Sequence, residues 1–334
     1  MLKNKKVIII SSLVIVIAMG VVLVYTGTLN TALRFFNKPI NSAEDVQNAP
    51  GIVEMTETSP SYGMIHSVNR YIAEGRNQWP YANDAICYEL KYKSNQYIVQ
   101  GFLALPDDYL EKEYPVLIYN RGGWNVISSI SSGHINIDQL YSLARAGFIV
   151  LATQHRGWDW GLTKDGGKDE FGGGDVQDVI ALVDLAEKFT FTNGKTYMFG
   201  WSRGATMTYI VLSRDDRITA AVAGAGPTDL LKAYDEGEDL LKTTLIELIG
   251  GTPEQLPDEY KKRSAVFWPD KINTPLFIAH GTEDLNVQVH HSADLYDKMK
   301  ALGKDVELQL YEGEDHGTAY SNYMETYLHW LLAH

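Results

Sequence analysis

Short apolar runs alternate with amphipathic helical stretches from residue 114 to the C-terminus, and this alternation constrains the fold more than any other feature. Strands are predicted at 114–119, 148–153, 196–199, 218–223, 275–279 and 306–311, with two more at 85–92 and 97–105. Helices are predicted at 137–146, 175–189, 205–213, 292–302 and 320–332. Such alternation is typical of a mostly parallel sheet with helices on both faces. The sequence therefore predicts an α/β protein.

Residues 228–270 interrupt this rhythm, since they are rich in Leu, Glu and Lys and lie between two predicted strands. They are predicted to form a helical insertion over the carboxyl edge of the sheet. Its apolar side chains, among them Leu245 and Trp268, either line a substrate pocket or pack the insertion onto the domain. The catalytic domain is expected to span 84–334, preceded at 26–83 by a tether and a short helical or irregular lead-in.

The first 25 residues have the pattern of a membrane anchor. Lys3, Lys5 and Lys6 precede an uncharged apolar run at 7–25. At about 1.5 Å per residue, a helix over this run nearly spans the ~30 Å hydrocarbon core of a bilayer. The lysines predict a cytoplasmic N-terminus and an extracellular catalytic domain. A cleaved signal peptide and a secreted protein remain the alternative, although the apolar region of a signal peptide usually has only about 7–15 residues.

Charge and cysteine content exclude several classes of function. The formal net charge is −13, with 29 basic and 42 acidic residues, whereas a nucleic-acid-binding protein usually presents a basic surface to phosphates. Cys87 is the single cysteine, so the chain cannot form an internal disulfide, and no Cys or His spacing indicates zinc. We therefore expect no nucleic-acid partner, no cofactor and no metal.

The segment Gly200-Trp201-Ser202-Arg203-Gly204 matches the pattern GxSxG between a predicted strand and a predicted helix. A strand-to-helix elbow of this kind strains the backbone of its central residue and exposes that side chain above the sheet edge. Glycines on either side remove side chains that would collide there. Ser202 is therefore the candidate nucleophile, and the alternative is a serine that caps an ordinary helix.

A serine hydroxyl needs a neighbouring base, and the base needs an orienting acid. In this arrangement the acid and then the histidine follow the serine along the chain. Asp284 comes after the strand 275–279 and His316 after the strand 306–311, so both lie in loops at the carboxyl ends of strands. Asp284 as a helix cap and His316 as a surface residue remain alternatives, and Glu283 and Asp315 are the nearest substitutes.

Three other histidines receive different interpretations. His280 ends a predicted strand and is expected to be structural. His290 and His291 precede a predicted helix and are expected to be exposed.

An oxyanion hole requires hydrogen-bond donors aimed at the charge that develops on the substrate. The backbone N–H of Arg203, the residue after the nucleophile, is one candidate. The second candidate is the backbone N–H of Gly122, in the glycine-containing loop at 120–125. A tight turn is the alternative explanation of that glycine pair.

Five stretches together resemble the catalytic domain of prolyl oligopeptidase-type serine peptidases, which belong to the α/β-hydrolase superfamily. They are YNRGGWN, QHRGWDWG with the later FGGGDVQDV, GWSRGA, HGTEDLNVQ and YEGEDHG. The resemblance covers about three quarters of the chain and places Ser202, Asp284 and His316 at the triad positions.

This resemblance implies a serine hydrolase that acts through an acyl-enzyme on peptide or amide bonds of small substrates. A carboxylic-ester hydrolase with the same triad is the alternative, and a non-catalytic binding domain is a third interpretation. Arg121 stands where well-known members have an oxyanion-binding tyrosine, so the second donor, backbone or Arg121 itself, stays open. A propeller blade takes about 40–45 residues, so residues 26–80 cannot hold the propeller of the large members.

Overall fold

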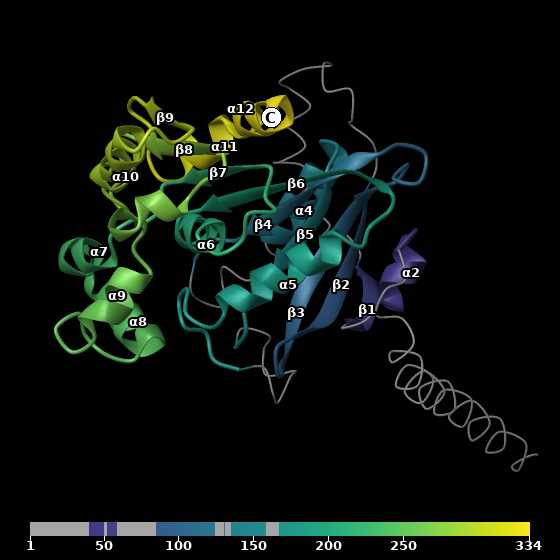
Figure 1. The fold of residues 1–334 in the computed structure, drawn as a ribbon, viewed down its shortest axis with the longest axis horizontal. Coiled ribbons are helices and arrows are strands. Elements are labelled where there is room, and N and C mark those ends of the chain that lie inside the picture. The colour runs from purple at the N-terminus through teal and green to yellow at the C-terminus, as the bar shows by residue number, and fades with distance from the viewer. Residues whose placement is uncertain (1–39, 50–51, 59–84, 124–129, 131–134, 158–166) are drawn as a thin grey trace, which may run out of the picture.

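The computed structural model describes residues 40–49, 52–58, 85–123, 130, 135–157 and 167–334. All strands within these residues belong to one nine-stranded sheet, in the order β1-β2-β3-β5-β4-β6-β7-β8-β9 (Figure 1). The strands are β1 (Ile52–Thr58), β2 (Ala85–Ser94), β3 (Tyr97–Pro106), β4 (Tyr114–Asn120), β5 (Ile149–Thr153), β6 (Thr192–Trp201), β7 (Ala220–Gly224), β8 (Leu276–Gly281) and β9 (Val306–Tyr311).

The sheet is mostly parallel, as the sequence predicts. The six strands from β5 to β9 in the sheet order pair in parallel. At the other end, β1, β2 and β3 pair antiparallel, and β3 joins β5 in antiparallel register. Parallel strands bring their carboxyl ends to one edge, so the loops after β6, β8 and β9 meet there.

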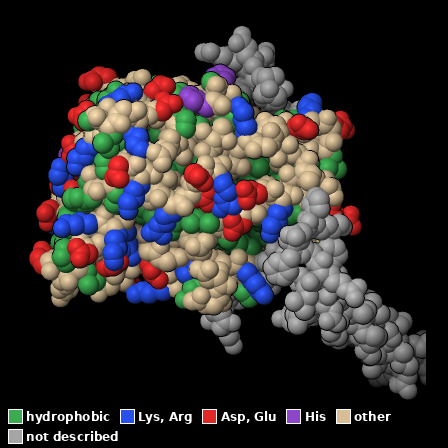
Figure 2. Space-filling view, in the orientation of Figure 1, with side chains coloured by type: hydrophobic (Ala, Val, Ile, Leu, Met, Phe, Trp, Pro, Cys, Tyr) green, Lys and Arg blue, Asp and Glu red, His purple; other side chains and the backbone are tan. Residues whose placement is uncertain are grey.

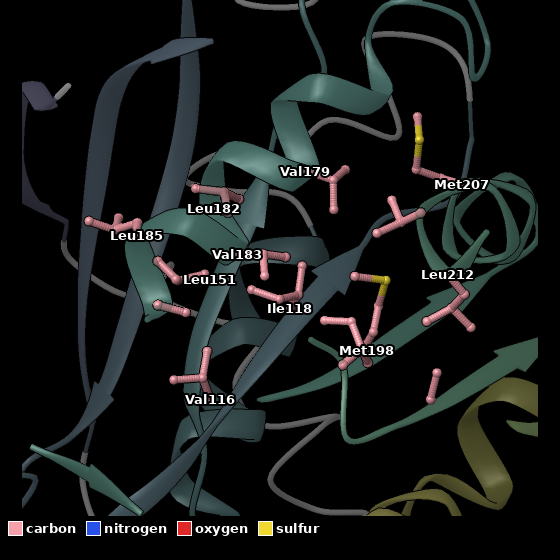
Figure 3. Packing of buried hydrophobic residues seen from close by; sticks show 14 of the residues in the cluster. Val116, Ile118, Leu151, Val179, Leu182, Val183, Leu185, Met198, Met207 and Leu212 are labelled. Atoms are coloured by element: carbon pink, nitrogen blue, oxygen red, sulfur yellow. The ribbon is translucent and has the colours of Figure 1, made fainter. Parts of the chain in front are cut away.

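Helices cover both faces of the sheet, and the cores follow from the alternation of side chains along each strand. On one face pack α5 (Val176–Ala186), α6 (Arg203–Leu212) and α10 (His290–Ala301), and on the other α4 (Ile135–Arg145), α11 (Thr318–Asn322) and α12 (Met324–Ala333). Figure 3 shows Val179 and Val183 of α5 facing Ile118 of β4 and Met198 of β6. Leu117, the neighbour of Ile118, points into the opposite core.

The lead-in contains a strand that the sequence analysis missed. Within the region interpreted as a tether, a short helix, α2 (Ala43–Gln47), precedes β1, which pairs antiparallel with β2. The prediction of an irregular lead-in is therefore wrong for β1. Among the described strands, β1 pairs only with β2 and lies at the edge of the sheet, and its sequence has no long apolar run.

The segment between β7 and β8 holds the helices α7 (Leu230–Glu236), α8 (Asp239–Ile249) and α9 (Pro257–Lys262). Leu245 and Tyr260 are fully buried in a small core with Phe171, a residue from outside the segment. Trp268 is buried in the main core, and its Nε1 donates to the backbone oxygen of Lys261. For Leu245 and Trp268 the structure therefore favours the packing interpretation over the pocket.

Among the described residues, no helix is both long and apolar enough to cross a bilayer. The predicted anchor at 7–25 lies outside those residues.

On the face drawn in Figure 2, basic and acidic side chains are interspersed.

Candidate active site

The turn between β6 and α6 places Ser202 in a strained backbone conformation. Its φ is 57° and its ψ is −127°, a region that residues with a side chain rarely adopt. The Ser202 N–H donates to the backbone oxygen of Gly224 at 2.8 Å, which ties the turn to β7. A Cβ at Gly204 would collide with the backbone oxygen of Asn120, and one at Gly200 with Gly204 itself. The glycines of the motif thus allow the close approach that holds the elbow.

Asp284 and His316 come together at the same edge of the sheet. The Nδ1 of His316 lies 2.6 Å from Oδ2 of Asp284. A carboxylate only accepts hydrogen bonds, so this nitrogen donates and Nε2 of His316 is left to accept a proton. The Asp284 side chain is fully buried, whereas 20% of the His316 side chain is exposed. The pair therefore combines a carboxylate that is shielded from water with an imidazole that is accessible from outside.

The Asp284 carboxylate is stabilised in its charged form. Its Oδ1 accepts hydrogen bonds from the backbone N–H groups of Asn286 and Val287, both at 2.9 Å. Burial by itself would raise the pKa of Asp284, but hydrogen bonds from His280 and His316 hold that pKa well below its usual range. Asp284 therefore stays ionised at neutral pH and can orient His316 throughout a catalytic reaction.

His280 is buried beneath this pair, in agreement with the structural role that we expected. Its Nδ1 lies 2.7 Å from Oγ of Ser292 on α10, and its Nε2 lies 2.9 Å from the backbone oxygen of Val287. The same Nε2 lies 3.3 Å from Oδ2 of Asp284. The sequence analysis did not foresee this second imidazole beside Asp284.

The loops after β8 and β9 are joined to each other and to the elbow. The N–H of Glu283 donates to the backbone oxygen of Glu314 at 3.0 Å. Nε1 of Trp201, next to Ser202, donates to the backbone oxygen of His316 at 3.1 Å. These bonds explain why three segments far apart in sequence meet at one edge.

The two substitute carboxylates have other positions. Glu283 is exposed, and its side chain does not replace Asp284 beside His316. Asp315 accepts hydrogen bonds from the N–H groups of Gly317 and Thr318 at 2.9 and 2.8 Å, so its carboxylate holds the turn that leads into α11. The geometry therefore brings Asp284, and neither neighbour, to the imidazole.

The two candidate oxyanion donors flank Ser202. Arg203 is the first residue of α6, where the N–H groups have no intrahelical acceptor. Gly122 lies directly against the elbow, since a Cβ on it would be 3.4 Å from Cβ of Ser202. The Arg121 guanidinium is buried and donates to the backbone oxygens of Gln154 and Gly122. Burial and the nearby Arg203 charge lower the pKa of Arg121 to about 9.

The side chain of Arg203 is held in a buried charge network that sequence reasoning missed. Its guanidinium donates to Asp169 at 2.6 Å and to Asp175 at 3.4 Å, and it stacks 4.9 Å above the ring of Phe171. The Arg203 charge holds the pKa of Asp169 below its usual range against the effect of burial. Burial and the Asp169 charge raise the pKa of Asp175 to about 7. The segment 169–175, which contains the motif FGGGD, thus anchors the first turn of α6 mainly through Asp169.

Replacing Asp169 with asparagine is expected to lower the free energy of unfolding by about 2–4 kcal/mol, because it removes the ionised partner of a buried guanidinium. Asp175→Asn is the matched control and should not lower this free energy, since asparagine resembles a protonated carboxyl. The folded-state pKa of Asp175 lies above its unfolded value, so wild type loses stability relative to Asp175→Asn as pH rises from about 4 to about 7. Urea unfolding at pH 5 and 8 measures both effects. Equal losses in the two variants would contradict this placement of the charge.

Comparisons with known proteins show the family to which the chain belongs. The model of the prolyl oligopeptidase family matches residues 134–334. An uncharacterized peptidase of Bacillus subtilis strain 168, YtmA, is 31% identical over 231 residues, which are 69% of this chain and 85% of that protein. Dipeptidyl peptidase 8 of Homo sapiens is 29% identical over 231 residues, 66% of this chain but 25% of its own length. The chain thus corresponds to about a quarter of the human relative.

A solved structure shares the fold. The acylaminoacyl peptidase of Pyrococcus horikoshii superposes with a TM-score of 0.63 at 20% identity, covering 79% of this chain and 42% of that one. The chain therefore has the α/β-hydrolase architecture that the resemblance implies.

Proposed function

The chain belongs to the prolyl oligopeptidase family of serine peptidases and is a hydrolase, and on this premise we propose that it cleaves peptide or amide bonds of small substrates through an acyl-enzyme. The proposed nucleophile is Ser202, the general base is His316, and Asp284 orients the base. The observation that carries this proposal is the 2.6 Å hydrogen bond between His316 and the buried Asp284, beside the strained turn of Ser202.

In the proposed reaction, Oγ of Ser202 forms a bond to the substrate carbonyl carbon while its proton passes to Nε2 of His316. Asp284 accepts the hydrogen bond from Nδ1 and stabilises the imidazolium. The N–H groups of Arg203 and Gly122 donate to the carbonyl oxygen as it gains negative charge. The carbon–nitrogen bond then breaks, and the imidazolium gives its proton to the leaving amine. Water, activated by the same imidazole, releases the acyl group.

A carboxylic-ester hydrolase with the same triad is the second candidate, because the described residues carry no propeller that would restrict access to peptides. The discriminating experiment is kcat/KM on amide and ester substrates that share one acyl group. A peptidase should turn over the aminoacyl amide well above the Ser202→Ala background. Turnover of the ester alone, with the amide at background, would replace the peptidase proposal by the esterase one.

We also propose that the apolar run at 7–25 anchors the enzyme, with the catalytic domain outside the cell. The full chain should remain with membranes after a high-salt wash and be released by detergent. Recovery of a chain that begins after residue 25 in the medium would favour the secreted alternative.

A further inference from the structure

Three potential metal ligands meet between the insertion and the helix that follows the Asp284 loop. Glu236 ends α7, whereas His290 and His291 begin α10. One ligand atom from each of the three residues lies within 4.8 Å of the other two. The cluster lies outside the candidate active site, and the proposed reaction uses none of its residues.

The distances in this cluster fit a common ion. Nε2 of His290 lies 2.9 and 3.0 Å from the two carboxylate oxygens of Glu236. Nε2 of His291 lies 3.5 Å from Oε2 of the same carboxylate. Two ligand atoms bonded tetrahedrally to one Zn²⁺, each at about 2.0–2.1 Å, are about 3.3 Å apart. The observed separations lie on both sides of that value, so small side-chain shifts would admit an ion.

An ion pair between Glu236 and His290 does not explain why His291 is buried beside them. We expected it to be exposed, but only 2% of its surface is accessible. Within the described residues, its Nδ1 has no hydrogen-bond partner. Its Nε2 faces Glu236 but lies farther from that carboxylate than Nε2 of His290 does, at 3.5 Å against 2.9 and 3.0 Å. A buried imidazole with only a weak polar contact is costly, whereas a divalent cation among the three groups would give Nε2 of His291 a strong partner.

The surroundings support the ligand set. Oδ2 of Asp294 lies 3.7 Å from Nδ1 of His290, the nitrogen that faces away from Glu236. That distance is too long for a hydrogen bond, and a small shift of Asp294 would let it accept from this nitrogen, as carboxylates do beside metal-bound histidines. Asp294 in turn accepts from Nζ of Lys232 on α7 at 2.7 Å, and Oγ1 of Thr228 donates to the backbone oxygen of His291 at 2.6 Å. These contacts hold α7 and α10 in register and preorganise the cluster.

We propose that Glu236, His290 and His291 bind one divalent transition metal, with Zn²⁺ as the ion that best suits two imidazoles and one carboxylate. The ion fastens the insertion to the start of α10, six residues after Asp284. A water molecule completes the coordination. The site revises our expectation, from cysteine and histidine spacing alone, that the protein holds no metal.

The test uses the full tag-free chain, treated with EDTA and dialysed. Addition of Zn²⁺ should raise the melting temperature of wild type by several degrees, with one ion bound per chain in calorimetry. Glu236→Gln and His290→Gln should abolish the thermal shift and weaken Zn²⁺ binding by more than about 100-fold, since even orienting neighbours of metal ligands are worth about 10–100-fold. Both replaced side chains are partly exposed, so the metal-free variants should melt close to wild type.

Matched controls are Asp235→Asn, the exposed neighbour of Glu236 on α7, and His329→Gln, an exposed histidine on α12. Both should keep the wild-type response. Substitution of Co²⁺ for Zn²⁺ adds a direct readout, because its visible d–d absorption should appear in wild type and the controls and be lost in the two ligand variants. Absence of Zn²⁺ binding in wild type would overturn the proposal, and so would binding that survives in both ligand variants.

Discussion

Replacing Ser202 with alanine is expected to lower kcat/KM for a small peptide substrate by about 10⁴- to 10⁶-fold. Alanine removes only the Oγ atom, so the loss should reflect the missing nucleophile. The residual rate should still exceed that of the uncatalysed reaction, since the oxyanion donors and the binding site remain. Steady-state kinetics at saturating and subsaturating substrate measure kcat and KM separately, and the loss should fall on kcat.

Ser213→Ala is the matched control, because Ser213 lies at the other end of α6 and its hydroxyl donates to the backbone oxygen of Ile210. This variant should retain kcat/KM within a few-fold. The melting temperature of Ser202→Ala should stay near that of wild type, since alanine must adopt the same strained φ. If Ser202→Ala keeps most of its activity, Ser202 is not the nucleophile.

Replacing Asp284 with asparagine is expected to lower kcat by about 10³- to 10⁴-fold. The amide can present its NH₂ group to Nδ1 of His316 and so favour the wrong tautomer, in which Nε2 carries the proton. The variant also removes a charge that faces the imidazolium at 2.6 Å. Kinetics of Asp284→Asn on the same substrate check this expectation.

Glu283→Gln gives the sharpest comparison for Asp284, because the two acids are adjacent and only Asp284 contacts His316. Glu283 is exposed, and its replacement should change kcat/KM by less than about threefold, a difference of under 1 kcal/mol. Comparable losses in the two variants would show that the loop positions its acids differently from the structure.

Much of the fold could be predicted from the sequence, because the buried strands β4 and β5 are continuous apolar runs and the edge strand β9 alternates apolar and polar residues. β9 begins and ends where predicted, and β4 and β5 differ by single residues. The errors occur where tertiary contacts, and not the local sequence, determine where a strand or helix begins and ends. β6 extends back over the polar residues 192–195, and the predicted helix at 320–332 is interrupted at Tyr323, whose ring stacks 3.6 Å from that of Tyr311.

The candidate site could be predicted as far as chain order and loop position allow. The pattern around Ser202 depends on local geometry, so the sequence identifies it directly. Whether Glu283 or Asp284 contacts His316 depends on the conformation of the loop. A shift of the loop by one residue would exchange the two acids, and the sequence does not fix that conformation. The contact of Arg203 with Asp169 joins segments that no local pattern connects. The burial of His291 depends on contacts with segments far away in the sequence, such as the one that holds Thr228, and sequence spacing does not reveal them.

The central claim, that Ser202 is the activated nucleophile, is tested most directly by covalent labelling with a fluorophosphonate. Attack by Oγ on phosphorus expels fluoride and leaves a stable serine adduct, which mass spectrometry locates in the sequence. The account predicts one adduct per chain on Ser202, absent from Ser202→Ala and formed much more slowly in Asp284→Asn. An adduct on another residue, or equal labelling of Ser202→Ala and wild type, would contradict it.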